Sequence, residues 1–170
     1  GAKLGLLKLF FLDEAAIWLT QPNTYSWRPV QQPLRVPTSK ARGIRARLNL
    51  MGVVEYGSRT VLYREIEGNT TGQTIVDFIE VLAADANPEC PTVVVLDRAS
   101  VHTCSAVNQQ RKRWQDLGLI IVHLPAYSPE LNDMEPEWRH LKYQELPERY
   151  YQNKTDLRRA VGEANWGIAI

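Results

Sequence analysis

The chain has 170 residues and a formal net charge of +1, from 20 Lys and Arg against 19 Asp and Glu. This length suits one domain with a sizeable core, and the near-neutral charge by itself gives no sign of a nucleic-acid-binding protein. Two cysteines are too few for a disulfide framework or a zinc motif, and no apolar stretch reaches membrane-spanning length, so we expect a cytoplasmic globular protein with free thiols.

The first half of the chain predicts three antiparallel strands and one long loop. Residues 7–13 predict a strand, in which strict alternation of side chains would place Leu7, Leu9, Phe11 and Asp13 on one face. Residues 45–54 and 59–66 are the next two strands, and the short polar segment between them is typical of a hairpin turn. Residues 21–40, rich in Pro, Gln, Ser and Thr, predict a loop of a length that is usually functional or disordered.

Basic residues are concentrated in and just after this loop. No acidic residue lies between Glu14 and Glu55. A local basic block in a near-neutral chain fits an anionic partner, although a solvated loop is an equal alternative on charge alone. The basic residues of this span are Arg28, Arg35, Lys40, Arg42, Arg45 and Arg47.

The second half predicts helices that alternate with two more strands. Thr70 or Thr71 can cap a helix, and its apolar positions recur at helical spacing. Residues 92–97 then form a buried strand, which is expected to run parallel to the first because a helix connects the two. The apolar positions of the helix are Ile75, Phe78, Ile79 and Leu82.

A similar helix and strand follow. Thr103 or Ser105 can start the helix, and residues 119–124 form a fifth strand. A last helix begins near Thr155. The expected buried positions of the helix before the fifth strand are Val107, Trp114 and Leu117.

Three carboxylates stand where these elements end or begin. Asp97 closes the apolar strand 92–97, and Asp13 interrupts the first apolar strand. Asn132 or Asp133 can cap a helix whose first turn contains Glu135. Buried carboxylates need a partner, and Mg²⁺ and Mn²⁺ prefer oxygen ligands. Two such ions could support phosphoryl transfer at this site.

Each carboxylate also has a simpler interpretation. An aspartate at a strand end is more often a turn or cap residue than a ligand, and Glu14 is an equal candidate on the face opposite Asp13. Glu135 could be a first-turn residue that simply complements the helix dipole. Asp133 and Glu137 could equally complement the dipole or bind a metal. Spacing alone therefore favours structural roles.

Four segments, in order, carry a resemblance that spans residues 10–142. The chain resembles the catalytic domain of mariner-related DDE transposases, which include many bacterial insertion-sequence transposases. The two C-terminal segments are the specific ones. The segments read FLDEAAIW at 11–18, WRP at 27–29, VVVLDRASVH at 93–102 and LPAYSPELNDMEPEWRHLK at 124–142.

The resemblance implies an α/β, ribonuclease H-like fold, with a five-stranded mixed sheet whose first three strands are antiparallel and which helices flank. It implies a catalytic and metal-binding triad of Asp13, Asp97 and Glu135, with two Mg²⁺ or Mn²⁺ ions. The expected activity is cleavage of DNA and strand transfer in a bacterial cell at the nucleoid, with transposon ends and target DNA as partners and a homodimer as the working unit. No membrane partner is expected.

The resemblance also implies DNA contacts and reveals departures. Trp27 and Arg28 match a Trp followed by a basic residue, a pair that could face DNA together with Lys40, Arg42, Arg45, Arg47 and Arg98. His102 matches a family histidine and is expected to be a structural hydrogen-bonder. Arg98 stands where the family has Asn, and Asp133 where it has Pro; Arg98 could compete with a metal or contact a phosphate.

We expect residues 1–170 to be a single catalytic domain without the helix-turn-helix region that recognises transposon ends. Two alternatives remain at this stage. One is an inactive remnant that only binds DNA or dimerises, which Arg98 and the missing region favour and the three retained carboxylates disfavour. The other is a different nuclease of the same fold, such as a ribonuclease H or a junction resolvase, which the WRP and SPELN segments disfavour.

Overall fold

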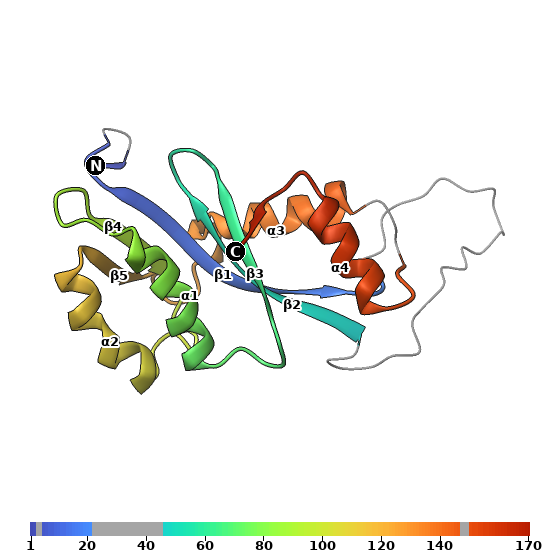
Figure 1. The fold of residues 1–170 in the computed structure, drawn as a ribbon, viewed down its shortest axis with the longest axis horizontal. Helices are drawn as coiled ribbons and strands as arrows, with labels where there is room; N and C mark the ends of the chain where they lie inside the picture. Colours follow the sequence, from blue (N-terminus) through green and yellow to red (C-terminus); the bar gives the residue numbers. More distant parts are fainter. Residues whose placement is uncertain (3–4, 22–45, 147–149) are drawn as a thin grey trace.

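The computed structural model describes residues 1–2, 5–21, 46–146 and 150–170 (Figure 1). Within these residues, six strands form one mixed sheet in the order β5-β4-β1-β2-β3-β6. The first three strands are antiparallel and β4 pairs parallel to β1, as the sequence predicts. The fifth strand, β5, pairs parallel to β4. The strands are β1 (Lys8–Trp18), β2 (Arg47–Glu55), β3 (Val61–Ile66), β4 (Thr92–Leu96), β5 (Leu119–His123) and β6 (Ile168–Ala169).

The prediction of five strands is wrong by one, because β6 also joins the sheet. This strand has two residues, Ile168 and Ala169, which pair parallel to Leu62 and Tyr63 of β3. A two-residue strand is too short to produce an alternating pattern, so only its tertiary pairing reveals it.

The first strand is also longer than predicted. It continues past Asp13 to Trp18, because residues on both sides of Asp13 pair with β2. Pairing with β4 on the other edge is much shorter and ends at Phe11 opposite Val95. Asp13 therefore lies within a strand whose β4 side has just become open, and this opening creates room for a site.

Helices cover both faces of the sheet (Figure 1). One core lies between the sheet and helices α1 and α2, and a second lies between the sheet and helices α3 and α4. The helices are α1 (Gly72–Ala84), α2 (Ser105–Asp116), α3 (Met134–His140) and α4 (Lys154–Glu163); a 3-10 turn, Pro129–Leu131, precedes α3, and a π-helical turn, Leu141–Glu145, extends it.

The helix boundaries follow local capping chemistry. Thr71 caps α1, since its side chain accepts a hydrogen bond from the Thr74 amide while the Thr74 hydroxyl accepts one from the Thr71 amide. For α2 the cap position is Cys104, which lies between the two predicted starts. The expected burial of Leu117 is wrong, because this side chain follows the last helical turn and is 41% exposed.

A glycine allows α3 to lie unusually close to the sheet. Gly52 of β2 is directly opposite Asp13 in the β1–β2 pairing. A Cβ atom at Gly52 would lie 2.7 Å from Met134 Cε and 2.8 Å from Trp138 Cη2, so the helix occupies the space that a side chain would need. The start of α3 is thus brought against the sheet beside Asp13.

Candidate active site

Asp13, Asp97 and Glu135 line one pocket of about 440 Å³. Asp13 comes from the middle of β1, Asp97 follows the last residue of β4, and Glu135 lies in the first turn of α3. The structure therefore brings the three predicted site residues together from three separate elements. The rest of the lining comes from Arg98, Ala99, residues 124–129 and Asn132.

The convergence follows from the sheet pairing. Since β1 and β4 are parallel and adjacent, Asp97 emerges from β4 next to the part of β1 that no longer has a partner on that edge. The alternation along β1 turns Asp13 toward the face that α3 covers, together with Phe11 and Ala15. The close approach of α3 at Gly52 then supplies Glu135.

The electrostatics of Asp13 show how closely the acidic groups are gathered. Burial raises the pKa of Asp13 to about 7, with further increases from the negative charges of Glu14, Glu135 and Asp97. A half-buried carboxylate in this surrounding is costly to ionise unless a cation lies nearby. A cation bound among these acidic groups would therefore stabilise the ionised form of Asp13.

The donor set fits Mg²⁺ or Mn²⁺ shared with a substrate. In the part of the chain that the structure describes, no three Asp, Glu, His or Cys side chains form a group that could hold a metal ion by themselves. Mg²⁺ is usually held by one or two carboxylates, with water and substrate phosphates completing the coordination. Asp13, Asp97 and Glu135 supply carboxylate oxygens, the donor type that such an ion takes.

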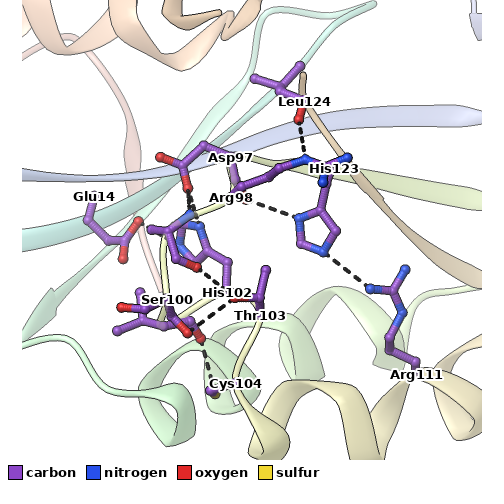
Figure 2. A network of polar contacts seen from close by, with 12 residues as sticks. Glu14, Asp97, Arg98, Ser100, His102, Thr103, Cys104, Arg111, His123 and Leu124 are labelled. Atoms are coloured by element: carbon purple, nitrogen blue, oxygen red, sulfur yellow. Dashed lines mark hydrogen bonds and ion pairs between the residues drawn. The ribbon is translucent and has the colours of Figure 1, made fainter. Parts of the chain in front are cut away.

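The side chain of Asp97 is braced by a buried histidine (Figure 2). His102 is 1% exposed, and its Nδ1 lies 2.6 Å from Asp97 Oδ1 while its Nε2 lies 3.0 Å from Glu14 Oε2. The Ala99 amide also donates to Asp97 Oδ1, at 2.8 Å. Burial lowers the pKa of His102, but hydrogen bonds and charges from Glu14 and Asp97 outweigh burial and raise the pKa to about 9.

The main chain of Asp97 is held from β5. His123 Nδ1 lies 3.0 Å from the Asp97 carbonyl oxygen, and Arg111 approaches the other ring nitrogen of His123 at 3.2 Å (Figure 2). Arg98 Nε donates to the Leu124 carbonyl oxygen at 3.1 Å. Among the described residues no ion pair joins Arg98 to Asp97, although Arg98 lines the pocket. Arg98 is therefore anchored to the residue that follows β5 and does not form an ion pair with Asp97.

The two acidic neighbours of Glu135 have a different role. Arg59, in the connection between β2 and β3, makes an ion pair of 2.7 Å with Asp133 and another with Glu137. Neither carboxylate lines the pocket, whereas Glu135 does. Arg59 has a positive φ of 60°, a conformation that is uncommon for a residue other than glycine. The choice among the three acids of α3 is thus made by contacts that the sequence does not show.

Lys142 is a candidate site residue that the sequence analysis missed. Burial lowers the pKa of Lys142, and the charges of Glu135 and Asp13 act in the opposite direction. The lysine is therefore near two of the three carboxylates. It follows Glu135 by seven positions, about two helical turns, so both belong to the same helix face. This spacing was the available signal.

The predicted DNA-contact residues are mostly outside the described residues. Trp27, Arg28, Lys40, Arg42 and Arg45 fall in the segment 22–45. Arg47 starts β2, with its guanidinium carbon 5.2 Å from the centre of the Trp18 ring. It lines a smaller pocket with Glu14 and not the pocket of the three carboxylates.

The sheet order and the carboxylates at its centre define a ribonuclease H-like domain. The chain belongs to the DDE superfamily endonucleases, because the model of that family matches residues 8–158. The predicted fold class and family are therefore confirmed. No curated protein matches the sequence.

Solved structures share this fold at low sequence identity. The Mos1 Strand Transfer Complex has a TM-score of 0.67 and 18% identity over 93% of this chain and 47% of that one. The Mos1 mariner paired end complex with Mn has a TM-score of 0.67 and 17% identity, over 91% and 47%. The catalytic domain of Mos1 mariner transposase has a TM-score of 0.59 and 17% identity, over 93% and 69%. The present chain thus spans about half the length of the Mos1 chains in the complexes.

Among the described residues, no helix has the length and apolar character needed to cross a membrane.

Proposed function

We propose that this chain is the catalytic domain of a transposase, which cleaves DNA and joins it to a target by phosphoryl transfer. The observation that carries the proposal is the convergence of Asp13, Asp97 and Glu135 on one pocket in a member of the DDE superfamily endonucleases. The carboxylates come from the elements that the sequence motifs predict.

In this proposal the three carboxylates hold two Mg²⁺ or Mn²⁺ ions. The bound ions supply Lewis-acid stabilisation of the phosphate charge and lower the pKa of the attacking group. Asp13, Asp97 and Glu135 would be the residues that hold the ions. Burial and neighbouring negative charges raise the pKa of Asp13 to about 7, and a nearby cation would favour its ionised form.

The reaction has two steps: hydrolysis of one phosphodiester, then a strand transfer in which one phosphodiester bond forms as another breaks. Water attacks the phosphorus of a phosphodiester, and the bond to the 3′ oxygen breaks, which releases a free 3′-hydroxyl and a 5′-phosphate. That hydroxyl then attacks a target phosphodiester and displaces its 3′ oxygen. Arg98, which lines the pocket, and Lys142, whose pKa responds to the charges of Glu135 and Asp13, are proposed to pair with non-bridging phosphate oxygens.

The partners follow from the same proposal. DNA ends and target DNA are the substrates, and Trp27, Arg28, Lys40, Arg42, Arg45 and Arg47 are proposed to contact their backbones. The similar fold of Mos1 in its strand transfer complex and its paired end complex supports DNA as the substrate. We also propose that residues 1–170 act as one catalytic domain within a dimer, and that recognition of transposon ends resides in a separate DNA-binding domain.

Plasmid nicking tests the proposal. Supercoiled plasmid is incubated with Mn²⁺ and the wild-type chain, Asp97→Asn or Glu89→Gln. Asp97→Asn keeps the side-chain size, and Glu89 is an exposed glutamate in the turn before β4 that lies outside the pocket. Metal-dependent nicking by the wild type and Glu89→Gln, lost in Asp97→Asn, is the expected result. Nicking that Asp97→Asn retains would remove the three-carboxylate site from the mechanism, and no nicking by any protein would favour an inactive remnant.

A further inference from the structure

We propose that Glu14 and His102 form a positioning pair that fixes the Asp97 carboxylate for cation binding. This inference rests on the proposed function, because it assigns a role toward the same cation site. Neither residue lines the pocket of the three carboxylates, so both act through Asp97 and neither is a catalytic residue.

The first observation is that His102 uses both ring nitrogens on carboxylates. Its Nδ1 faces Asp97 Oδ1 at 2.6 Å, and its Nε2 faces Glu14 Oε2 at 3.0 Å. Ionised carboxylates only accept hydrogen bonds, so a ring that carries a proton on each nitrogen can donate to both of them. With the ring 1% exposed, water cannot substitute for either partner. Figure 2 shows the ring between the two acidic side chains.

The second observation concerns the orientation of the Asp97 carboxylate. Its Oδ1 already accepts from His102 and from the Ala99 amide. The side chain is 51% exposed, so without these two donors little would restrict its rotation. With Oδ1 held, Oδ2 is the oxygen left to face a cation. The buried histidine thus gives an exposed ligand a single orientation.

The third observation is the place of Glu14 in the sheet. Backbone pairing between β1 and β4 ends at Phe11 opposite Val95, before either strand reaches its acidic residue. Glu14 follows Asp13 on β1, with its side chain on the opposite face of the strand. The path from Glu14 through His102 to Asp97 therefore connects the two strands where their hydrogen bonds have stopped. We infer that it sets the spacing between Asp13 and Asp97.

Two substitutions of Glu14 separate positioning from charge. Glu14→Gln and Glu14→Ala both remove the negative charge that raises the pKa of Asp13. Only Gln retains an oxygen that can accept the hydrogen bond from His102 Nε2. An effect of charge alone would change both variants equally, and it would strengthen cation binding because Asp13 would ionise more readily. Loss of positioning would weaken binding in Glu14→Ala alone.

The experiment is a Mn²⁺ titration of the 170-residue chain, with free Mn²⁺ followed by electron paramagnetic resonance. Wild type, Glu14→Gln, Glu14→Ala and the remote control Glu89→Ala are compared, and thermal unfolding shows that each is folded. We expect Glu14→Ala to bind Mn²⁺ about 10- to 100-fold more weakly than Glu14→Gln, the usual cost of losing a group that orients a ligand. Glu14→Gln should stay within about threefold of wild type.

Two results would overturn the inference. Equal Mn²⁺ affinity of the folded Glu14→Ala and Glu14→Gln variants would show that the hydrogen bond to His102 does not position Asp97. The proposed function would still stand if Asp97→Asn abolished binding in the same titration. If the wild-type chain bound Mn²⁺ no better than Asp97→Asn, the cation site itself would be wrong, and the positioning role would fall with it.

Discussion

Replacing Gly52 by alanine should disturb the site without touching any acidic residue. The added Cβ would lie 2.7 Å from Met134 Cε and 2.8 Å from Trp138 Cη2. Carbon atoms pack best at about 3.5–4.0 Å, so α3 or its side chains must retreat by roughly 0.7 Å or more. The methionine methyl can rotate away, but the Trp138 ring is rigid and also packs on Trp166, with the ring centres 5.2 Å apart.

The expected size of the effect follows from overpacking. Added methyl groups in a filled core cost about 1–3 kcal/mol, and alanine in a strand recovers up to about 1 kcal/mol relative to glycine. The free energy of unfolding should therefore fall by about 1–2 kcal/mol. Because Glu135 is carried by the displaced helix, Mn²⁺-dependent nicking should fall on the order of 10- to 100-fold, as for other small misplacements of catalytic groups.

The matched control is Gly57→Ala in the turn between β2 and β3. A Cβ atom there meets nothing within 4 Å, so stability and nicking should both stay near wild type. Urea unfolding gives the stability of each variant, and plasmid nicking gives the activity. If Gly52→Ala nicks at the wild-type rate although it is destabilised, the close approach of α3 does not position Glu135, and the packing argument fails.

Three further predictions concern charge. In the metal-free chain, the free energy of unfolding of Asp13→Asn should exceed that of wild type by an amount that grows from about pH 4 to pH 7, up to about 4 kcal/mol. The reason is that the folded wild type holds the Asp13 proton up to about pH 7, whereas the unfolded chain releases it near the ordinary pKa of 3.8. Equal pH slopes for wild type and variant in urea unfolding would refute this. Arg59→Ala should lower the free energy of unfolding by less than about 1 kcal/mol, since its ion pairs are exposed. It should still slow nicking severalfold, because the first turn of α3 would be held less firmly. An unchanged nicking rate would show that these ion pairs do not position Glu135. Lys142→Ala should weaken DNA binding and reduce by about one the slope of log affinity against log salt concentration. Lys142→Arg should keep the wild-type affinity and slope. An unaltered slope for Lys142→Ala, measured by fluorescence anisotropy, would show that no phosphate contact is lost.

The parts of the fold that the sequence predicts are those with local signals. The Thr71 cap and the apolar stripe of α1 depend on residues within one helix, and the Val-rich run of β4 indicates burial on both faces. The antiparallel order of the first three strands follows from the turn between β2 and β3 and is confirmed. The motifs also indicate which three acids meet, although spacing alone favoured structural roles for them.

The parts that could not be predicted depend on partners distant in the chain. The end of β1 is set by pairing with β2, which the run of residues around Asp13 does not reveal. Glu14 was an equal candidate for the site until the structure paired it with His102, 88 positions away. Likewise Asp133 and Glu137 are distinguished from Glu135 only by their contacts with Arg59, more than 70 positions earlier.

The most direct test of the account is the position of a bound cation. Crystals of the chain soaked with Mn²⁺ should show an anomalous scattering peak between Asp13, Asp97 and Glu135, at about 2.0–2.3 Å from at least one oxygen of Asp97. That result would show that the three carboxylates share a cation site. A well-diffracting crystal with the pocket open to solvent and no peak there at millimolar Mn²⁺, or a peak only elsewhere, would contradict the central claim.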